Sequence, residues 1–334
     1  MRAFAFTSYG RNAKGTMCDI PEPRIDSDEV LVEMHAASVN PIDFKVRNGD
    51  LRFLISRNFP LVLGSDGAGV VKDIGKDVTR FKPGDQVYFR IPKNQDGTFA
   101  EFTRIPEFAL AMAPTKISLV DSAALPLVSL TSIQALFELA DLQPGQRVFI
   151  PAGSGGIGSH AIQIAKRKGL FVATSTSSRN IQWVASLGAD QVLDYTKIDP
   201  ATHLKNFDAV YDTLGGREQT RMFQVLKPGG ILVSIVGPPT SQTARELGLG
   251  RFKSFVLALV ARSAQQAAKQ AGVRYEFLFM RPDGKQLADL ASWVDSGFVR
   301  PIIDRRYSLE ETGQALAYVS EGRAQGKVLI QIRG

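Results

Sequence analysis

The stretch from Arg147 to Gly158, RVFIPAGSGGIG, most constrains how this chain can fold. It begins with an apolar, β-prone run, Val148 to Ile150, directly after a Pro144-Gly145 turn, and such a run predicts a short buried strand. After the glycines, apolar residues between Ala161 and Ala165 predict a helix with one buried face. A strand that passes through glycines into a helix is typical of the first unit of a nucleotide-binding α/β sheet.

Three of these glycines have the G-x-G-x-x-G spacing. In such a turn the first glycine allows the tight bend, the second lets the backbone approach a pyrophosphate, and the third lets the helix pack closely on the strand. The phosphates then lie at the helix N-terminus, where backbone N–H groups point outward. The sequence therefore predicts a dinucleotide site formed by Gly153, Gly155, Gly156, Ile157 and Gly158.

The order of strands and helices predicts the context of this turn. A chain of 334 residues is long for one hydrophobic core, so two domains are expected. Residues 1 to about 115 show short strands separated by turns, which predicts a compact β-barrel-like domain. From about residue 121, strands alternate with helices, and this order predicts right-handed βαβ units in a parallel sheet. The glycine turn then follows the first strand of that sheet.

Composition and charge argue against several functions. The formal net charge is +7, but Lys and Arg are scattered, so a nucleic-acid partner is not expected. The N-terminus lacks the apolar core of a signal peptide, and the longest apolar run, Phe255 to Ala261, is too short to span a bilayer. We expect a cytoplasmic protein without membrane contact. The helix expected over 251–271 fits packing or a dimer contact better than a membrane surface.

The residues after the second predicted strand indicate which dinucleotide binds. Enzymes that use NAD place a carboxylate there for the ribose 2′-OH, and a carboxylate would repel the 2′-phosphate of NADP. The segment 174–180, TSTSSRN, has hydroxyls and a guanidinium but no carboxylate, which predicts NADPH as the cofactor. The alternative is a solvated loop whose hydroxyls cap the next helix. The candidate cofactor contacts are Ser175, Ser177, Ser178 and Arg179.

Further motifs extend the pattern over nearly the whole chain. They are Ala37 to Lys45 (ASVNPIDFK), Gly64-x-Asp66-x-x-Gly69, Pro83-Gly84-Asp85-x-Val87, Ala124 to Leu127 followed by Thr131, Leu187 to Asp190, Asp194-Tyr195, and Gly322 to Lys327. With the glycine turn, they resemble the medium-chain dehydrogenase/reductase superfamily, in its zinc-independent quinone oxidoreductase and enone (alkenal) reductase branch. The resemblance implies a chaperonin-10-like β-barrel domain over 1–120 and 282–334. It implies a Rossmann doubly wound parallel sheet, the NADPH-binding domain, over 121–281.

The resemblance also implies roles near the reacting groups. Asn40 and Lys45 would lie beside the nicotinamide and the substrate, and Thr131 beside the nicotinamide. Asn40 could donate to a substrate carbonyl, or it could only satisfy the turn before Pro41. Lys45 could reach the cofactor or lie on the surface.

Other positions would contact the rest of the cofactor. Tyr195 could stack on or bond the adenosine side, or it could be a half-buried packing residue. The backbone of Ile235 and Val236, after the fifth strand, would face the nicotinamide amide. By resemblance Arg323 and Lys327 would lie near the phosphates, and the alternative for both is an exposed cation.

A zinc site is not expected. Zinc alcohol dehydrogenases of this superfamily carry a cysteine where this chain has Asn40 and a His-Glu pair where it has Ser65-Asp66, and their four-cysteine zinc lobe is absent at 93–97. Zinc needs three or four Cys, His or carboxylate ligands close together. No such set is offered by the single cysteine and three histidines, Cys18, His35, His160 and His203. A label of zinc binding inherited by similarity is therefore not expected to apply.

The absence of a metal ligand set limits the reaction. Alcohol oxidation would lack its usual electrophile, whereas a conjugated carbonyl is already electrophilic. We expect an NADPH-dependent, zinc-independent oxidoreductase that transfers hydride to quinones or α,β-unsaturated carbonyls, and by resemblance a homodimer. One alternative is an NADPH-binding scaffold or RNA-binding crystallin-like protein without turnover. Another is an enoyl-thioester reductase, which would need a cleft wide enough for a long acyl chain.

Two segments depart from the family pattern. Related quinone reductases often have a tyrosine shortly after the Asn-containing turn, and residues 49–53 have none, so the proton is expected from solvent. The segment 239–272 is longer than in the simplest members. It could cover the substrate cleft or form an oligomer contact.

Overall fold

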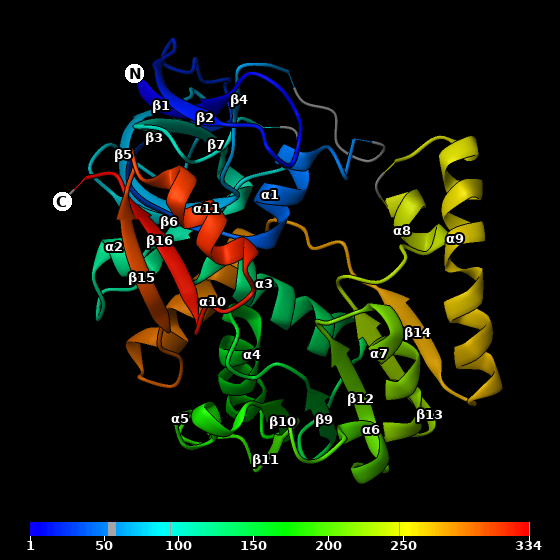
Figure 1. Cartoon of the computed structure of the whole chain (residues 1–334). Coiled ribbons are helices and arrows are strands. Elements are labelled where there is room, and N and C mark those ends of the chain that lie inside the picture. Colours follow the sequence, from blue (N-terminus) through cyan, green and yellow to red (C-terminus); the bar gives the residue numbers. More distant parts are fainter. Residues whose placement is uncertain (53–57, 94, 247, 334) are drawn as a thin grey trace. The chain divides into compact units, whose positions relative to one another are not determined.

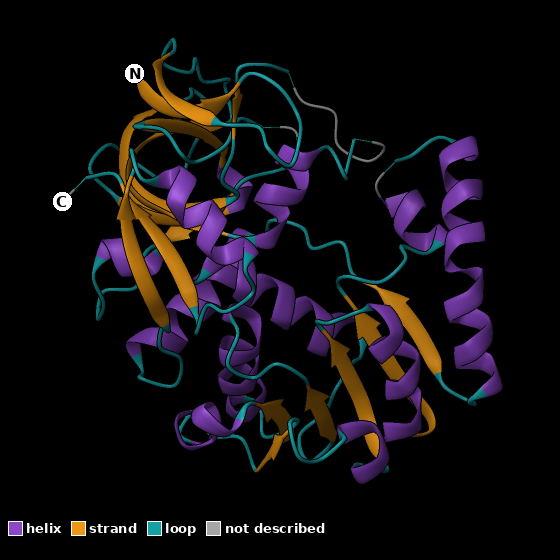
Figure 2. Cartoon of the chain, viewed as in Figure 1, coloured by secondary structure: helices purple, strands orange, loops and turns teal. Residues whose placement is uncertain are grey.

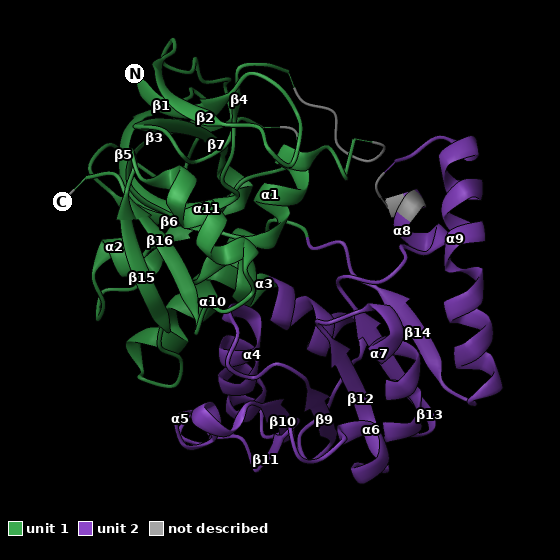
Figure 3. Ribbon diagram, in the orientation of Figure 1, with its two compact units in different colours: residues 1–130, 281–334 green, residues 131–280 purple. Residues whose placement is uncertain are grey.

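The chain forms two compact units in a computed structural model that describes residues 1–52, 58–93, 95–246 and 248–333 (Figure 1). Unit 1 comprises Met1–Leu130 and Arg281–Gly334, and unit 2 comprises Thr131–Met280 (Figure 3). Three of the segments discussed above each include a residue outside the described part: Phe53, Asn94 and Leu247. Each unit is described by itself.

The first boundary between the units lies ten residues later than the predicted 120/121. Helix α2 (Leu119–Ser122) packs against strands of unit 1, and α3 (Pro126–Ile133) begins there. The backbone N–H of Leu127 donates to a carboxylate oxygen of Asp66 at 3.1 Å, which ties the start of α3 to unit 1. The second boundary, 280/281, is one residue from the predicted one.

Unit 2 contains one sheet of six parallel strands in the order β11-β10-β9-β12-β13-β14. Numbered from the first strand of the unit, this order is 3-2-1-4-5-6, the order of a doubly wound Rossmann sheet, which confirms the predicted fold. The strands are β9 (Arg147–Ile150), β10 (Phe171–Thr176), β11 (Gln191–Asp194), β12 (Phe207–Asp212), β13 (Leu226–Ser234) and β14 (Arg274–Phe277).

Helices alternate with these strands along the chain (Figure 2). Helix α3 is followed directly by a π-helical segment, η2 (Gln134–Leu139). Fully buried side chains such as Phe149, Val210 and Leu232 hold the core of the sheet. The remaining helical segments are α4 (Gly156–Arg167), η3 (Ser178–Asn180), α5 (Ile181–Ala185), α6 (Pro200–His203), α7 (Gly216–Arg221), η4 (Met222–Val225), α8 (Ser241–Glu246) and α9 (Arg251–Gln270).

Unit 1 is built from a seven-stranded and a three-stranded sheet, which agrees with the predicted chaperonin-10-like domain. The larger sheet has the order β15-β16-β3-β5-β6-β8, with β7 also paired to β3, and the smaller has the order β2-β1-β4. The strands are β1 (Arg2–Phe6), β2 (Gly15–Asp19), β3 (Glu29–Val39), β4 (Leu61–Val62), β5 (Asp66–Ile74), β6 (Gln86–Arg90), β7 (Phe102–Pro106), β8 (Leu110–Met112), β15 (Ile303–Ser308) and β16 (Lys327–Gln331).

The C-terminal segment completes the larger sheet of unit 1. Strand β16 pairs antiparallel with β3, so that Val328 lies opposite Val39. This pairing brings Lys327 beside the start of the helix that follows β3. The helical segments of unit 1 besides α2 and the start of α3 are α1 (Pro41–Asn48), η1 (Glu107–Ala109), α10 (Gly284–Asp295) and α11 (Thr312–Ser320).

Among the helices of the described residues, none combines the length and the apolar character that a bilayer span requires.

Candidate functional site

The glycine turn lies between β9 and α4, and its glycines differ in what surrounds them. A Cβ added to Gly153 would lie 2.2 Å from Oγ1 of Thr174, and one added to Gly158 would lie 2.3 Å from the carbonyl oxygen of Ala152. A Cβ on Gly155 would have its nearest neighbour at 3.4 Å, an ordinary contact distance. Packing therefore requires the first and third glycines, and only Gly155 is left for the close approach of a ligand.

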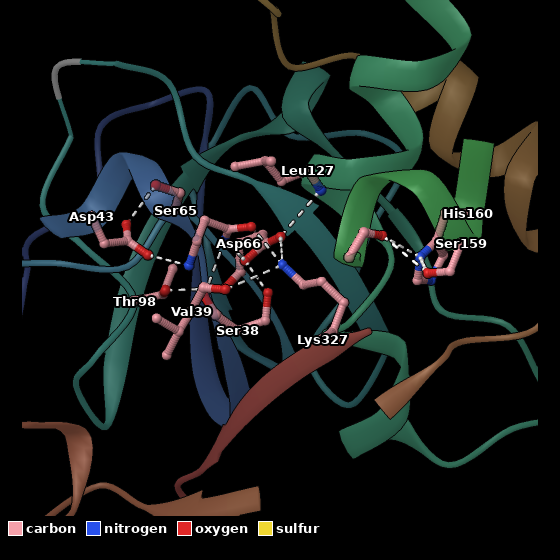
Figure 4. A network of polar contacts seen from close by, with 12 residues as sticks. Ser38, Val39, Asp43, Ser65, Asp66, Thr98, Leu127, Ser159, His160 and Lys327 are labelled. Carbon is pink, nitrogen blue, oxygen red and sulfur yellow. Dashed lines mark hydrogen bonds and ion pairs between the residues drawn. The ribbon is translucent and has the colours of Figure 1, made fainter. Parts of the chain in front are cut away.

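Helix α4 begins at Gly156 and Ile157 with no side-chain cap and no acidic residue in its first turn. The positive end of the helix dipole is therefore not neutralised by an acidic side chain of the first turn. It can bind the negative charge of a diphosphate. The buried ring of His160 contacts the carbonyl oxygen of Gly156 through Nδ1 at 2.8 Å (Figure 4). The N–H of Gly153 donates to the carbonyl oxygen of Ser175 at 2.9 Å, which ties the turn to β10. These residues fit a dinucleotide.

A carboxylate lies beside the predicted phosphate loop, contrary to expectation. Asp194 ends β11 and lies opposite Thr176 at the end of β10. It accepts hydrogen bonds from Oγ of Ser178 and from Oγ1 of Thr196, the latter at 2.6 Å. These hydrogen bonds lower the pKa of Asp194 to about 2. The prediction considered only the segment after β10, and the carboxylate comes from the neighbouring strand.

The other predicted adenosine-side residues differ in exposure. Ser175 is buried in β10, whereas Arg179 is exposed in η3. Oγ of Ser177 accepts a hydrogen bond from the Asn180 side chain at 3.3 Å, but the Ser177 hydroxyl makes no cap hydrogen bond to the helical segment that follows, so the capping alternative does not hold for this residue. Tyr195 is 58% exposed, which excludes the half-buried packing role considered for it.

The backbone N–H groups of the residues just after β13 donate hydrogen bonds within unit 2. The N–H of Ile235 donates to the carbonyl oxygen of Asp212 at 3.2 Å, and the N–H groups of Val236 and Gly237 donate to Oγ of Ser234 at 3.3 and 2.8 Å. These N–H groups, which were expected to face a nicotinamide amide, therefore already have acceptors within unit 2.

Asn40 lies in a buried polar network of unit 1, part of which Figure 4 shows. It is the N-cap residue of α1, and its backbone N–H donates to Asp43 at 2.8 Å. Its side-chain nitrogen donates to the carbonyl oxygen of Ser38 at 3.2 Å and to Asp66 at 3.0 Å. Both amide hydrogens are used inside the network. The structural role considered for Asn40 therefore accounts for its side chain, and no amide hydrogen is left for a substrate carbonyl.

Lys327 belongs to the same network, and the alternative of an exposed cation does not hold for it. Its side chain is 3% exposed, and its ammonium donates to Oδ1 of Asn40 at 2.5 Å and to the carbonyl oxygen of Val39 at 3.4 Å. The ammonium also lies 4.0 Å from the Asp66 carboxylate. Burial lowers the pKa of Lys327, and the Asp66 and Asp43 carboxylates oppose that shift. These contacts place the ammonium in the interior of unit 1, which does not support the expected role near the phosphates.

The remaining predicted residues lie outside this network. Lys45 is half-buried on α1, and Arg323 is exposed in the turn after α11. Thr131 is 5% exposed on α3, in unit 2.

Two carboxylates that were not among the candidate site residues, Asp43 and Asp66, complete the network. Asp66 accepts hydrogen bonds from Oγ of Ser38 at 2.6 Å, and Asp43 accepts one from Oγ of Ser65 at 2.9 Å. Burial raises the pKa of Asp43 to about 7, and the charge of Asp66 contributes to the increase. The spacing Asn40-x-x-Asp43 before a helix is a capping pattern that could have identified Asp43.

The Asp43→Asn variant should flatten the pH dependence of stability between about pH 4 and pH 7. The folded protein holds the proton up to a pKa of about 7, whereas the ordinary pKa of an aspartate is 3.8, so the free energy of unfolding falls as pH rises through this window. The full shift corresponds to roughly 4 kcal/mol as an upper limit. Urea unfolding at several pH values measures the slope, and the exposed Asp50→Asn is the control. An unchanged slope in Asp43→Asn would contradict the raised pKa.

The donor set at this position does not fit zinc. Asn40 and Ser65 both direct hydrogens at carboxylates, and the ammonium of Lys327 would repel a dication. Across the described ranges, no group of three or more His, Cys, Asp or Glu side chains is arranged to hold a metal ion.

Comparisons with known proteins agree with this architecture. Residues 26–115 match the alcohol dehydrogenase GroES-like domain, and residues 187–330 match the family described as zinc-binding dehydrogenase. The quinone oxidoreductase from Coxiella burnetii superposes with a TM-score of 0.85 and 31% identity, covering 100% of this chain and 99% of that one.

The names of several proteins with similar sequences state related activities. A mitochondrial NAD(P)H oxidoreductase of Danio rerio is 34% identical, covering 91% of this chain and 84% of the relative. The 2-methylene-furan-3-one reductase of Solanum lycopersicum is 33% identical (99% and 79% covered), and the chloroplast envelope quinone oxidoreductase homolog of Arabidopsis thaliana is 30% identical (99% and 98%). The chain therefore belongs to the medium-chain dehydrogenase/reductase superfamily and is an oxidoreductase of its quinone and enone reductase branch.

Proposed function

We propose that the protein is an NADPH-dependent, zinc-independent reductase that transfers hydride to quinones or α,β-unsaturated carbonyls. The observation that carries this proposal is the buried contact of Lys327 with Asn40 and Asp66, because by resemblance Asn40 and Ser65-Asp66 stand where zinc alcohol dehydrogenases carry a cysteine and a His-Glu pair. An ammonium and hydrogen-bonded carboxylates at this place do not suit a metal ion that would polarise an alcohol oxygen, and this supports an acceptor that is already electron-poor. The homodimeric state is proposed from the family resemblance.

The glycine turn and the loop after β10 support NADPH as the hydride source. The uncapped N-terminus of α4 and the open position at Gly155 suit the diphosphate. The exposed guanidinium of Arg179 suits a 2′-phosphate. Asp194 opposes that phosphate, but hydrogen bonds from Ser178 and Thr196 hold its carboxylate, and Lys197 lies 3.6 Å away. When bound, the reduced nicotinamide supplies the hydride.

The acceptor is proposed from its own reactivity. A conjugated carbonyl accepts hydride at carbon, and solvent supplies the proton, so the protein mainly orients the two reactants and excludes water. Two relatives are named for a quinone and for a 2-methylene-furan-3-one, an enone. Both acceptor types belong to this chemical class.

The direct test measures NADPH consumption by the full chain with 1,4-naphthoquinone and with 3-buten-2-one, with and without a zinc chelator. We expect turnover of at least one acceptor and no effect of the chelator. Tight NADPH binding without turnover would instead support a scaffold, and loss of activity in chelator would contradict zinc independence. Turnover of a long-chain enoyl thioester alone would favour an enoyl-thioester reductase.

The Arg179→Ala variant should raise KM for NADPH by about tenfold or more, since a charge-assisted hydrogen bond to a phosphate contributes about 1.5 to 3 kcal/mol. KM for NADH should change little, because NADH lacks the 2′-phosphate. Steady-state kinetics with both cofactors measure the difference, and Arg274→Ala, an exposed cation on β14, is the control. Equal increases for the two cofactors would show that Arg179 does not bind the phosphate.

A further inference from the structure

Helix α9 has two apolar faces, and only one of them is covered. The inner face packs into unit 2 through buried side chains at a spacing of three and four residues, Leu257, Ala261, Ala264 and Ala268. Ala264 and Ala268 belong to the same core as the strands of the sheet. These buried side chains hold α9 against the rest of unit 2. They do not account for the apolar residues on the other face of the helix.

The outer face of α9 is apolar in its first half. Phe252 is 75% exposed, Phe255 62%, Leu259 51% and Val260 54%. The spacing of Phe252, Phe255 and Leu259 places them on one side of the helix, away from the buried residues. We call these four residues the outer stripe. Apolar side chains gathered in this way on a surface mark an interaction site, since scattered ones are common but clusters are not.

Positive charges flank the outer stripe. At helical spacing, Arg251, Arg262 and Lys269 lie along one side of the stripe and Lys253 along the other. Residues 251–270 contain no acidic residue. The whole segment 239–272 has five Lys or Arg residues and one Glu, so that it carries +4 of the net +7 of the chain. The partner of the outer stripe must therefore be both apolar and anionic.

A second copy of this chain does not meet that requirement. Two outer stripes packed together would bring two sets of cations close to each other, and like charges across an interface are repulsive. A bilayer with anionic headgroups meets both conditions, because acyl chains cover the apolar residues while the headgroups pair with Lys and Arg. Long cationic side chains can extend from the flanks to the headgroups.

We propose that the outer stripe of α9 docks reversibly on the surface of an anionic lipid bilayer, with the helix lying in the interface. The sequence argued against this role because periodicity does not show which apolar face is buried. Docking is independent of the proposed function. If that function also holds, it would bring the reductase to the phase in which lipophilic quinones dissolve.

The test is co-sedimentation of the full chain with phosphatidylcholine vesicles that contain about 30% phosphatidylglycerol, since anionic headgroups supply the attraction. We expect binding that weakens about fivefold for each cation neutralised, and that falls steeply in pure phosphatidylcholine or high salt. Phe252→Ser combined with Phe255→Ser should weaken binding at least about tenfold through lost apolar burial. The matched control is Phe108→Ser with Phe298→Ser, phenylalanines of unit 1 that are 57% and 56% exposed.

Several outcomes would overturn the proposal. They are no binding of the unaltered chain, equal binding by the Phe252/Phe255 variant, and equal loss in the control. If sedimentation velocity showed that the Phe252/Phe255 variant dissociates an oligomer while vesicles bind neither protein, the stripe would be a contact between copies. Loss of turnover with a water-soluble quinone, with vesicle binding retained, would place the stripe at the substrate. Inactivity of the unaltered chain would refute the proposed function and leave the docking result standing.

Discussion

Replacing Lys327 by methionine should lower the free energy of unfolding by about 3 to 5 kcal/mol, the usual effect of removing one partner from a buried ion pair. Methionine has a similar length, so packing is largely kept while Asp66 and Asp43 lose the buried cation beside them. Oδ1 of Asn40 also loses its donor. Urea unfolding at pH 8 measures the loss. At pH 5 the deficit should be smaller, because protonation of a carboxylate removes the excess negative charge.

Arg323→Met is the matched control for Lys327→Met. It removes a cation four residues earlier in the chain, but from an exposed position, and such substitutions usually change stability by less than about 0.5 kcal/mol. Similar losses in both variants, or a deficit at Lys327 that does not depend on pH, would show that the buried ion pair is not what stabilises this region.

Substituting alanine for Gly155 should weaken NADPH binding by about a hundredfold while leaving the fold intact, because a methyl group there meets the ligand rather than the protein. The backbone of Gly155 has φ −78° and ψ 171°, values that alanine adopts freely, and its added Cβ has no neighbour closer than 3.4 Å. Fluorescence titration with NADPH measures the affinity, and thermal unfolding without cofactor measures the stability.

The Gly158→Ala variant, in the same turn, should instead destabilise the fold. Its Cβ would lie 2.3 Å from the carbonyl oxygen of Ala152 and 2.8 Å from Cα of Gly153, so backbone must move, at a cost of about 1 to 3 kcal/mol. If Gly155→Ala bound NADPH normally, the dinucleotide would not pass over this turn. If it unfolded like Gly158→Ala, the two glycines would not have the separate roles that the geometry gives them.

Local patterns were enough to predict most of unit 2. In unit 2, the apolar residues of each strand and helix recur with the period of that element. The glycine turn connects two neighbouring elements, so no contact between distant segments had to be known. In unit 1 the same reasoning missed β15, whose sequence IDRRYS has exposed Arg305 and Arg306 at its centre. Charged residues on a strand at the edge of a sheet prevent unwanted pairing and also hide the apolar alternation.

Contacts between distant segments could not be predicted in the same way. Lys327 and Asn40 are 287 residues apart, and the register of β16 against β3 is what brings them together. Asp194 approaches Ser178 because β11 lies next to β10, which a search along one loop does not reveal. For α9, the sequence predicted a helix that packs or forms a dimer contact, but only packing shows that Leu257 is buried and Phe255 exposed.

The strand order of unit 1 has a consequence for synthesis on the ribosome. Unit 2 is continuous in sequence, so its sheet can form as soon as its residues have emerged. The first 130 residues of unit 1 are synthesised early. Strands β15 and β16 of the same unit emerge only after all of unit 2 has been synthesised. Until then residues 36–39 of β3 lack β16 as a pairing strand, and Asp43 and Asp66 lack the ammonium of Lys327. The N-terminal part of unit 1 therefore cannot complete its larger sheet until the last residues have been translated.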